Sequence, residues 1–206
     1  MSDRVKSMAD HYAKASIAVV WDTVDCKIPV GQSIDSVTDN ISSALRNSGY
    51  LGNISIKAYG DKEFRVSSQR PNVKLIVAEG TSSQRKTRIF YDILAWALDN
   101  PASVLMFVYG DVSRDMNFIN DELGSLRFRH FEVLLCQPED AKGLLFFHAA
   151  KVWRWDNLCV GGTPISEPQR HALILAKTPS DYYHNVPDDW NCGMPSDEVE
   201  EEKLSS

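Results

Sequence analysis

Residues 104–111, VLMFVYGD, carry the clearest fold signal in this chain of 206 residues. The first six of them are apolar or aromatic, and Gly110 and Asp111 end the run. A strand with one face in water alternates apolar and polar residues, whereas a strand covered on both faces is apolar throughout. We therefore predict that residues 104–109 form a strand in a sheet with helices on both faces.

Strand and helix patterns alternate on both sides of this run. Strands are also predicted at residues 16–21, 53–59, 73–78, 131–136 and 152–155. Helices are predicted at residues 33–48, 85–99, 117–126 and 138–150. Ser33 is a candidate N-cap of the first helix, and Gly49 lies just past its end. The alternation predicts an α/β fold, a three-layer sandwich with a mostly parallel central sheet.

Composition divides the chain into three parts. Residues 1–15 are polar without a clear period, and we expect a flexible arm or a short helix. Residues 16–163 hold the predicted strands and helices and are expected to form one domain. Residues 164–206 lose this pattern, so we expect an irregular extension with a disordered acidic tail. The apolar segment 171–177 is expected to dock on the domain.

Composition also excludes several classes of protein. No apolar run approaches the ~20 residues of a membrane helix, so no membrane insertion is expected. The four cysteines form no CxxC pair and no secretory signal is recognisable, which favours a cytoplasmic protein with reduced thiols. Residues 196–206 hold five acids and one lysine, so they account for −4 of the net charge of −6. The near-neutral remainder argues against strong, sequence-independent DNA binding, but not against a local basic patch or a metal site.

Aspartates follow three of the predicted strands. They are Asp22, Asp61 and Asp111. In an open α/β sheet, ligands gather beyond the carboxyl ends of the strands, and converging carboxylates favour a hard cation such as Mg²⁺ or Mn²⁺. A metal held there activates water and stabilises the leaving oxygen of a phosphodiester. The alternative is that each aspartate serves a turn or a helix cap.

Other sites for phosphate or acyl chemistry lack their motifs. The sequence has no G-x-G-x-x-G dinucleotide motif and no G-x-x-x-x-G-K-[ST] P-loop. A G-x-S-x-G nucleophile elbow and an H-x-x-x-H pair are also absent. The strand-end aspartates therefore remain the candidate site.

Several segments together resemble the NYN domains, PIN-like nuclease relatives found in the limkain and meiosis-regulator group and in plant proteins. The segments are residues 19–29 (VVWDTVDCKIP), 92–101 (DILAWALDNP), 108–111 (VYGD), 126–138 (LRFRHFEVLLCQP) and 152–162 (VWRWDNLCVGG). The resemblance covers about residues 16–163. It implies a PIN-like α/β sandwich and either a metal-dependent ribonuclease or an RNA-regulatory protein. It also implies a peroxisomal location as a secondary option.

The resemblance assigns roles to individual acids. Asp22 matches the first acid of the family pattern, and Asp111 matches the Gly-Asp after the central strand. Asp61 is a strand-end acid with a weaker match, and Asp115 fills the next acidic position if its loop bulges. The sequence departs from the pattern at Val24, at Asp25 and at residues 86–87, where a cation, Lys86, replaces an expected acid. A lysine beside Asp22 and Asp111 would lower metal occupancy.

Two hypotheses follow. In the first, the chain is an endoribonuclease in which Asp22, Asp61, Asp111 and Asp115 hold Mg²⁺ or Mn²⁺. In the second, it is a catalytically degenerate NYN module that binds RNA or a protein partner, or forms a homodimer.

Basic side chains near the same edge are candidate contacts for single-stranded or structured RNA. They are Arg85, Lys86, Arg88 and Arg114. The alternative for each is ordinary solvated surface charge.

Overall fold

The computed structural model describes residues 11–62, 64, 66–100, 103–110, 116–141, 146 and 148–177. The strands are β1 (Ile17–Asp22), β2 (Ile54–Gly60), β3 (Val73–Val77), β4 (Val104–Val108), β5 (Glu132–Gln137) and β6 (Lys151–Arg154). The helices are α2 (Ile34–Asn47), α3 (Ser82–Asp99), α4 (Met116–Phe128), α5 (Trp155–Leu158) and α6 (Glu167–Lys177). Residues 11–14 are also helical.

The strands form one six-stranded sheet in the order β3-β2-β1-β4-β5-β6. Every neighbouring pair is parallel. The strand order reverses between β1 and β4, the position at which open α/β sheets bind ligands. The predicted parallel α/β sandwich is therefore confirmed, and β1 and β4 lie at its centre.

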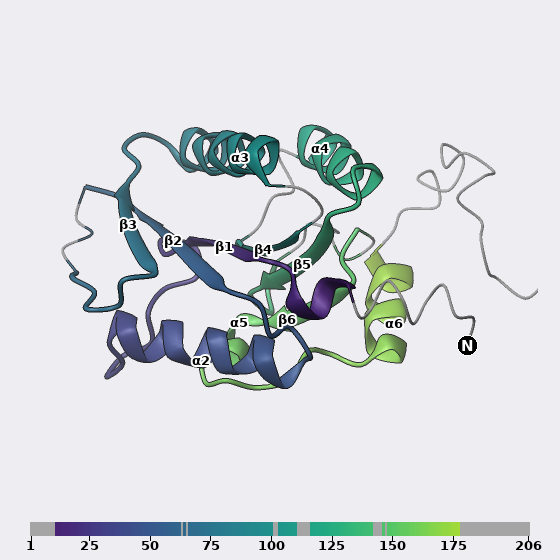
Figure 1. Ribbon diagram of the computed structural model, residues 1–206, viewed down its shortest axis with the longest axis horizontal. Helices are drawn as coiled ribbons and strands as arrows, with labels where there is room; N and C mark the ends of the chain where they lie inside the picture. Colours follow the sequence, from purple (N-terminus) through teal and green to yellow (C-terminus); the bar gives the residue numbers. More distant parts are fainter. Residues whose placement is uncertain are drawn as a thin grey trace, which may run out of the picture.

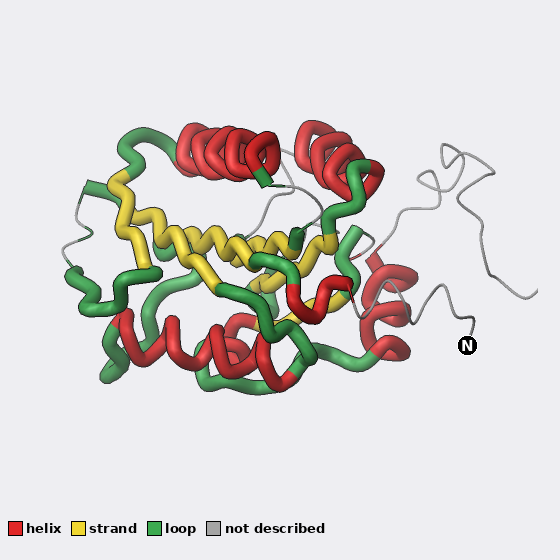
Figure 2. The backbone as a smooth tube through the Cα atoms, in the orientation of Figure 1, coloured by secondary structure: helices red, strands yellow, loops and turns green. Residues whose placement is uncertain are grey.

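Helices cover both faces of the sheet, with α3 and α4 on one side and α2 and α5 on the other (Figures 1 and 2). Side chains of β1 alternate between the two faces. Val19 and Trp21 pack in the cluster that includes α2, whereas Ala18 and Val20 pack in the cluster that includes α3 and α4. All six residues of β1 are buried, which explains why the first five are apolar.

The helix starts follow local capping. Ser33 caps α2 as predicted, because its hydroxyl accepts from the Ser36 N–H at 3.0 Å. Helix α3 begins three residues before the predicted start at residue 85. Thr81 and Gln84 form a reciprocal capping box that sets this start. The earlier start places residues 85 and 86 within the helix, one turn from its amino end.

The predicted helix over residues 138–150 is wrong in the residues that the structure describes. Residues 138–141, 146 and 148–150 contain no α-helix. The Ala150 N–H donates to the Val133 carbonyl at 2.8 Å, so the chain already lies beside β5 before β6 begins. Phe146 is buried in the core, where the Arg154 guanidinium lies over its ring. These long-range contacts override the local helical pattern.

The expected extension contains helix α6, and its predicted docking is confirmed. Leu173 and Ile174 pack against the core cluster on the α3 side of the sheet. The side chain of Arg170 donates to the Ala149 carbonyl just before β6. Within the described part of the chain, no helix is long and apolar enough to span a membrane.

Candidate functional site

The carboxyl ends of β1 and β4 lie beside the loop after β1, which carries one acid, Asp25. Asp22 ends β1, and Gly110 follows β4. A Cβ built on Gly110 would lie 2.5 Å from the Cβ of Asp25 and 2.6 Å from its Oδ2. Only glycine therefore lets the Asp25 side chain pack against the end of β4 without displacement. The Trp21 indole N–H donates to the Cys26 carbonyl at 2.7 Å, and this hydrogen bond fixes the loop.

Asp22 is completely buried, and its carboxylate is held by an arginine from α3. The Nε of Arg85 lies 2.9 Å from both Oδ1 and Oδ2 of Asp22. The Val24 N–H also donates to Oδ1, at 3.0 Å. The side chain of Arg85 is itself only 4% exposed, so this ion pair is an internal one.

Asp25 completes the arrangement with two cations. Its Oδ1 lies 3.2 Å from an Nη of Arg85, and its Oδ2 lies 3.1 Å from the Nζ of Lys86. The side chain of Lys86 is 8% exposed. Asp22, Asp25, Arg85 and Lys86, here called the strand-end cluster, thus combine two carboxylates with two buried cations.

Burial shapes the acid–base behaviour of this cluster. It raises the pKa of Asp22 above the ordinary value, and the nearby Asp25 carboxylate raises it further. The Arg85 guanidinium opposes this by lowering the pKa of Asp22. Ionised Asp22 therefore depends on Arg85, because a buried carboxylate without a partner is strongly disfavoured.

The carboxylate oxygens that the structure describes in this cluster do not fit a site for a divalent metal ion. Both oxygens of Asp22 and both oxygens of Asp25 are in contact with cationic groups. A metal ion between them would face the charges of Arg85 and Lys86, which supply no ligand. Among the described residues, no group of three or more His, Cys, Asp or Glu side chains could hold a metal.

The structure brings some of the predicted site residues together. Asp22, Arg85 and Lys86 meet in the strand-end cluster, and Arg85, rather than Lys86, contacts Asp22. Asp61 follows β2 at the same edge of the sheet, since Asp22 pairs in register with Tyr59. The predicted residues Asp111, Arg114 and Asp115 lie outside the described residues.

Arg88 lies one turn beyond Arg85 on α3 and is 62% exposed. Its Nε contacts Asp92 at 3.1 Å, and Asp92 accepts from the Tyr59 hydroxyl at 2.9 Å. Of the three predicted RNA contacts that the structure describes, Arg88 presents the most side-chain surface to solvent.

Two further polar side chains, Gln137 and Tyr109, lie at this edge of the sheet, and Gln137 was not predicted from the sequence. Gln137 ends β5 and donates to the Gly110 carbonyl at 3.0 Å. The hydroxyl of Tyr109 is buried, and no hydrogen-bond partner for it appears in the structure described here. Burial raises the pKa of Tyr109 well above its ordinary value, and Asp22 adds to this effect. Gln137 could have been recognised in the sequence as a polar residue at the end of an apolar run, directly before Pro138.

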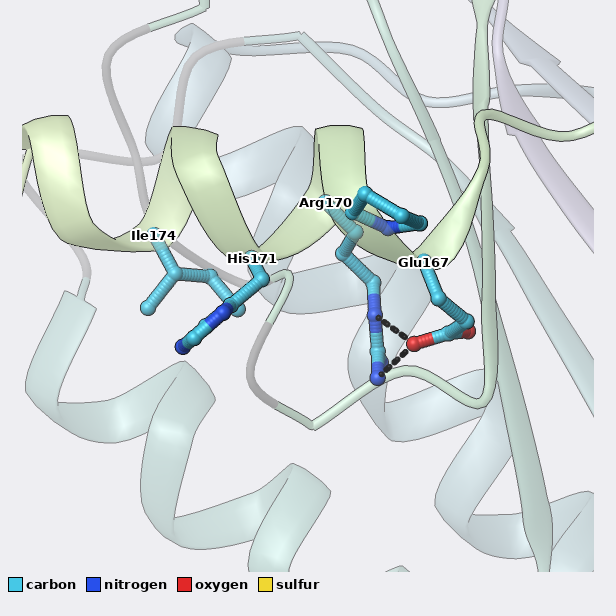
Figure 3. A pocket seen from close by; sticks show the side chains of 5 residues that line it. Glu167, Arg170, His171 and Ile174 are labelled. Carbon is cyan, nitrogen blue, oxygen red and sulfur yellow. Dashed lines mark hydrogen bonds and ion pairs between the residues drawn. The ribbon is translucent and has the colours of Figure 1, made fainter. Parts of the chain in front are cut away.

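A hollow of about 460 Å³ lies on α6, away from the strand-end cluster. Figure 3 shows the ion pair between Glu167 and Arg170 beside His171 and Ile174. Arg170 also contacts the carbonyl of Ala149, just before the amino end of β6. Because the strand-end cluster lies at the carboxyl ends of the strands, the two sites are separate. None of the site residues predicted from the sequence lines this hollow.

Comparisons with known proteins agree with the fold. The model of the NYN domain family matches residues 16–149. The chain is also 26% identical over 181 residues to "Meiosis regulator and mRNA stability factor 1" of Mus musculus. That alignment covers 83% of this chain but only 10% of the mouse protein. The resemblance inferred from the sequence motifs is therefore confirmed.

Proposed function

The chain belongs to the NYN domain family, and we propose that it is an RNA-binding regulatory domain that does not cleave RNA by metal-dependent chemistry. The strand-end cluster is the observation that carries this proposal. Asp22 is the acid that best matches the family pattern, and both of its carboxylate oxygens accept from the Nε of Arg85.

Two cations in place of a metal ion change what the site can do. A divalent ion lowers the pKa of a bound water and supplies hydroxide for attack on phosphorus. Arginine offers only hydrogen-bond donors and does not deprotonate in proteins. Asp22 is also a poor general base for water, because it is buried and its oxygens are engaged. The cluster therefore supports electrostatic and structural roles rather than hydrolysis.

RNA is the favoured ligand for two reasons. The name of the mouse relative connects that protein with mRNA stability. The charges within the strand-end cluster also balance, so Asp22 and Asp25 present no uncompensated negative charge that would repel phosphates. In this proposal, exposed Arg88 contacts a phosphate directly, and Arg85 and Lys86 act by neutralising Asp22 and Asp25.

We also propose that the protein acts in the cytoplasm. Cys26, Cys136 and Cys159 are buried free thiols in the structure, as a reducing compartment favours. Imaging of a fluorescent fusion tests this location, and its accumulation in peroxisomes would support the secondary option instead.

The test of the proposed function is RNA binding in the absence of metal. Fluorescence anisotropy with labelled single-stranded RNA compares the full chain in Mn²⁺ with the full chain in EDTA. We expect equal affinity in both, and weaker binding by Arg88→Glu. Arg46→Glu is the control, because Arg46 lies in the last turn of α2, across the sheet from α3. Binding that requires Mn²⁺, or no binding in either buffer, would overturn the proposal.

A further inference from the structure

The outer face of α3 carries a second apolar stripe in addition to its core stripe. Tyr91 is 60% exposed and Leu98 is 76% exposed, with exposed Ala95 between them. Their spacing of four and three residues places them in one line along the helix. The core side of α3 instead buries Ile89, Phe90, Ile93 and Ala97. The exposed stripe is thus not needed for the core of the domain.

Helix α4 extends this apolar surface. Phe128, in the last turn of α4, is 86% exposed. The next residue, Arg129, donates to the Ala97 carbonyl at 2.9 Å, which brings the ends of the two helices together. Figure 1 shows α3 and α4 side by side on one face of the sheet. Exposed apolar side chains gathered in this way mark an interaction surface.

We propose that this surface, the α3–α4 face, is the interface of a two-fold homodimer in which α3 packs antiparallel to α3 of a second copy. The charges at the two ends of the stripe favour this partner. Arg88 lies one turn before Tyr91, and exposed Asp99 directly follows Leu98. Antiparallel packing brings the basic end of each helix to the acidic end of the other, whereas parallel packing would bring like charges together.

The residue spacing is consistent with two-fold symmetry. When Tyr91 faces Leu98 of the second copy, the symmetry axis passes between positions 94 and 95, where Leu94 packs against the core of its own domain and Ala95 is exposed. Ala95 has a small side chain, so the helices approach closely at the centre of the contact. Arg88 then lies within one turn of Asp99 of the second copy, a separation that its long side chain can span. The same contacts recur on both sides of the axis, as a closed dimer requires.

RNA fits this face less well than a second copy does. Beside the stripe, Arg88 already contacts Asp92, Arg129 already donates to the Ala97 carbonyl, and Asp99 adds a negative charge. Such a surface lacks the excess of cations that phosphate binding needs. The two proposals share Arg88 but no residue of the strand-end cluster, and Leu98→Glu, which leaves Arg88 unchanged, tests the dimer separately from RNA binding.

Sedimentation of the full chain across a concentration series, without RNA, tests the dimer. The wild-type mass should rise from 23.2 kDa toward twice that value as concentration increases. Leu98→Glu should raise the dimer Kd by about tenfold or more, because it places two charges in the interface. Leu175→Glu is the matched control, since Leu175 is a 53% exposed leucine on α6. A wild-type chain that stays monomeric, or equal effects of the two variants, would overturn the proposal.

Charge exchange gives a second test that a folding defect cannot imitate. Arg88→Glu and Asp99→Arg should each weaken the dimer, and the double variant should restore it, because the two ends then attract again. A double variant as weak as the single ones would refute the antiparallel arrangement. A monomeric chain whose RNA affinity falls on Tyr91→Ala would assign this face to RNA instead.

Discussion

The Nε of Arg85 lies 2.9 Å from each carboxylate oxygen of Asp22, and both side chains are closed to solvent. This contact joins the end of the central strand β1 to the first turns of α3. Asp22, the acid that best matches the family pattern, is therefore paired with a cation from the protein itself. The consequences reach both the stability of the fold and the chemistry of the strand ends.

Loss of Arg85 should be costly for folding. Arg85→Met keeps much of the side-chain volume but leaves Asp22 buried without its partner, and we expect a loss of about 3–5 kcal/mol in the free energy of unfolding. Arg88→Met, one turn along the same helix and 62% exposed in the native protein, should cost about 0–1 kcal/mol. Urea unfolding measures both. Equal losses would contradict the internal ion pair, and added Asp22→Asn should recover stability in the Arg85→Met chain.

Gly110 should not tolerate a side chain. The Cβ of Gly110→Ala would lie 2.5 Å from the Cβ of Asp25, so the loop must move and the cluster loosens. We expect a loss of about 1–3 kcal/mol. Gly124→Ala, inside α4 with open space around the added Cβ, should stabilise by up to about 1 kcal/mol. Thermal unfolding compares the two variants, and a neutral effect at Gly110 would argue against the packing of Asp25 on β4.

The charge of Lys86 should control metal affinity. Lys86→Asp removes a buried cation from Asp25 and adds an acid, so Mn²⁺ binding measured by calorimetry should become tighter. Lys14→Asp makes the same change in charge at an exposed position and should leave Mn²⁺ affinity unchanged. An unchanged affinity in the Lys86 variant would show that this cation does not exclude the metal.

Acid should destabilise the fold through His148. Burial, with the Arg127 charge as the next cause, lowers the pKa of His148 from 6.5 to about 4. Between these two values the unfolded chain binds a proton that the folded chain does not. Stability should therefore fall as pH drops through this window, by up to about 3 kcal/mol from this residue.

His148→Gln should flatten the pH dependence of unfolding between pH 6.5 and about 4. His171→Gln, at an exposed position on α6, serves as the control. Parallel pH profiles for the wild type and the His148 variant would rule out this contribution.

The strands β1, β4 and β5 were predictable because most of their residues form apolar runs. The predicted strand 104–109 differs from β4 by one residue, and the predicted start at 73 is that of β3. The predicted start of α3 was three residues late, although Thr81 and Gln84 have the spacing of a capping box. The helix predicted at 138–150 failed because contacts with distant residues, such as Val133, determine that segment.

The site was only partly predictable. The strand-end position of Asp22 and the cation at Lys86 were visible in the sequence. That Arg85 reaches Asp22 while Lys86 reaches Asp25 depends on the rotation of α3 over the sheet, which spacing along the chain does not give. Gln137 meets Gly110 only because β4 and β5 are neighbours.

The most direct test of the central claim is a cleavage assay with purified full chain and end-labelled single-stranded RNA. The strand-end cluster predicts intact RNA at high protein concentration, both with Mn²⁺ and with EDTA. Cleavage that requires Mn²⁺, stops with EDTA and disappears in Asp22→Asn would contradict it, because Asp22 would then serve a metal rather than Arg85.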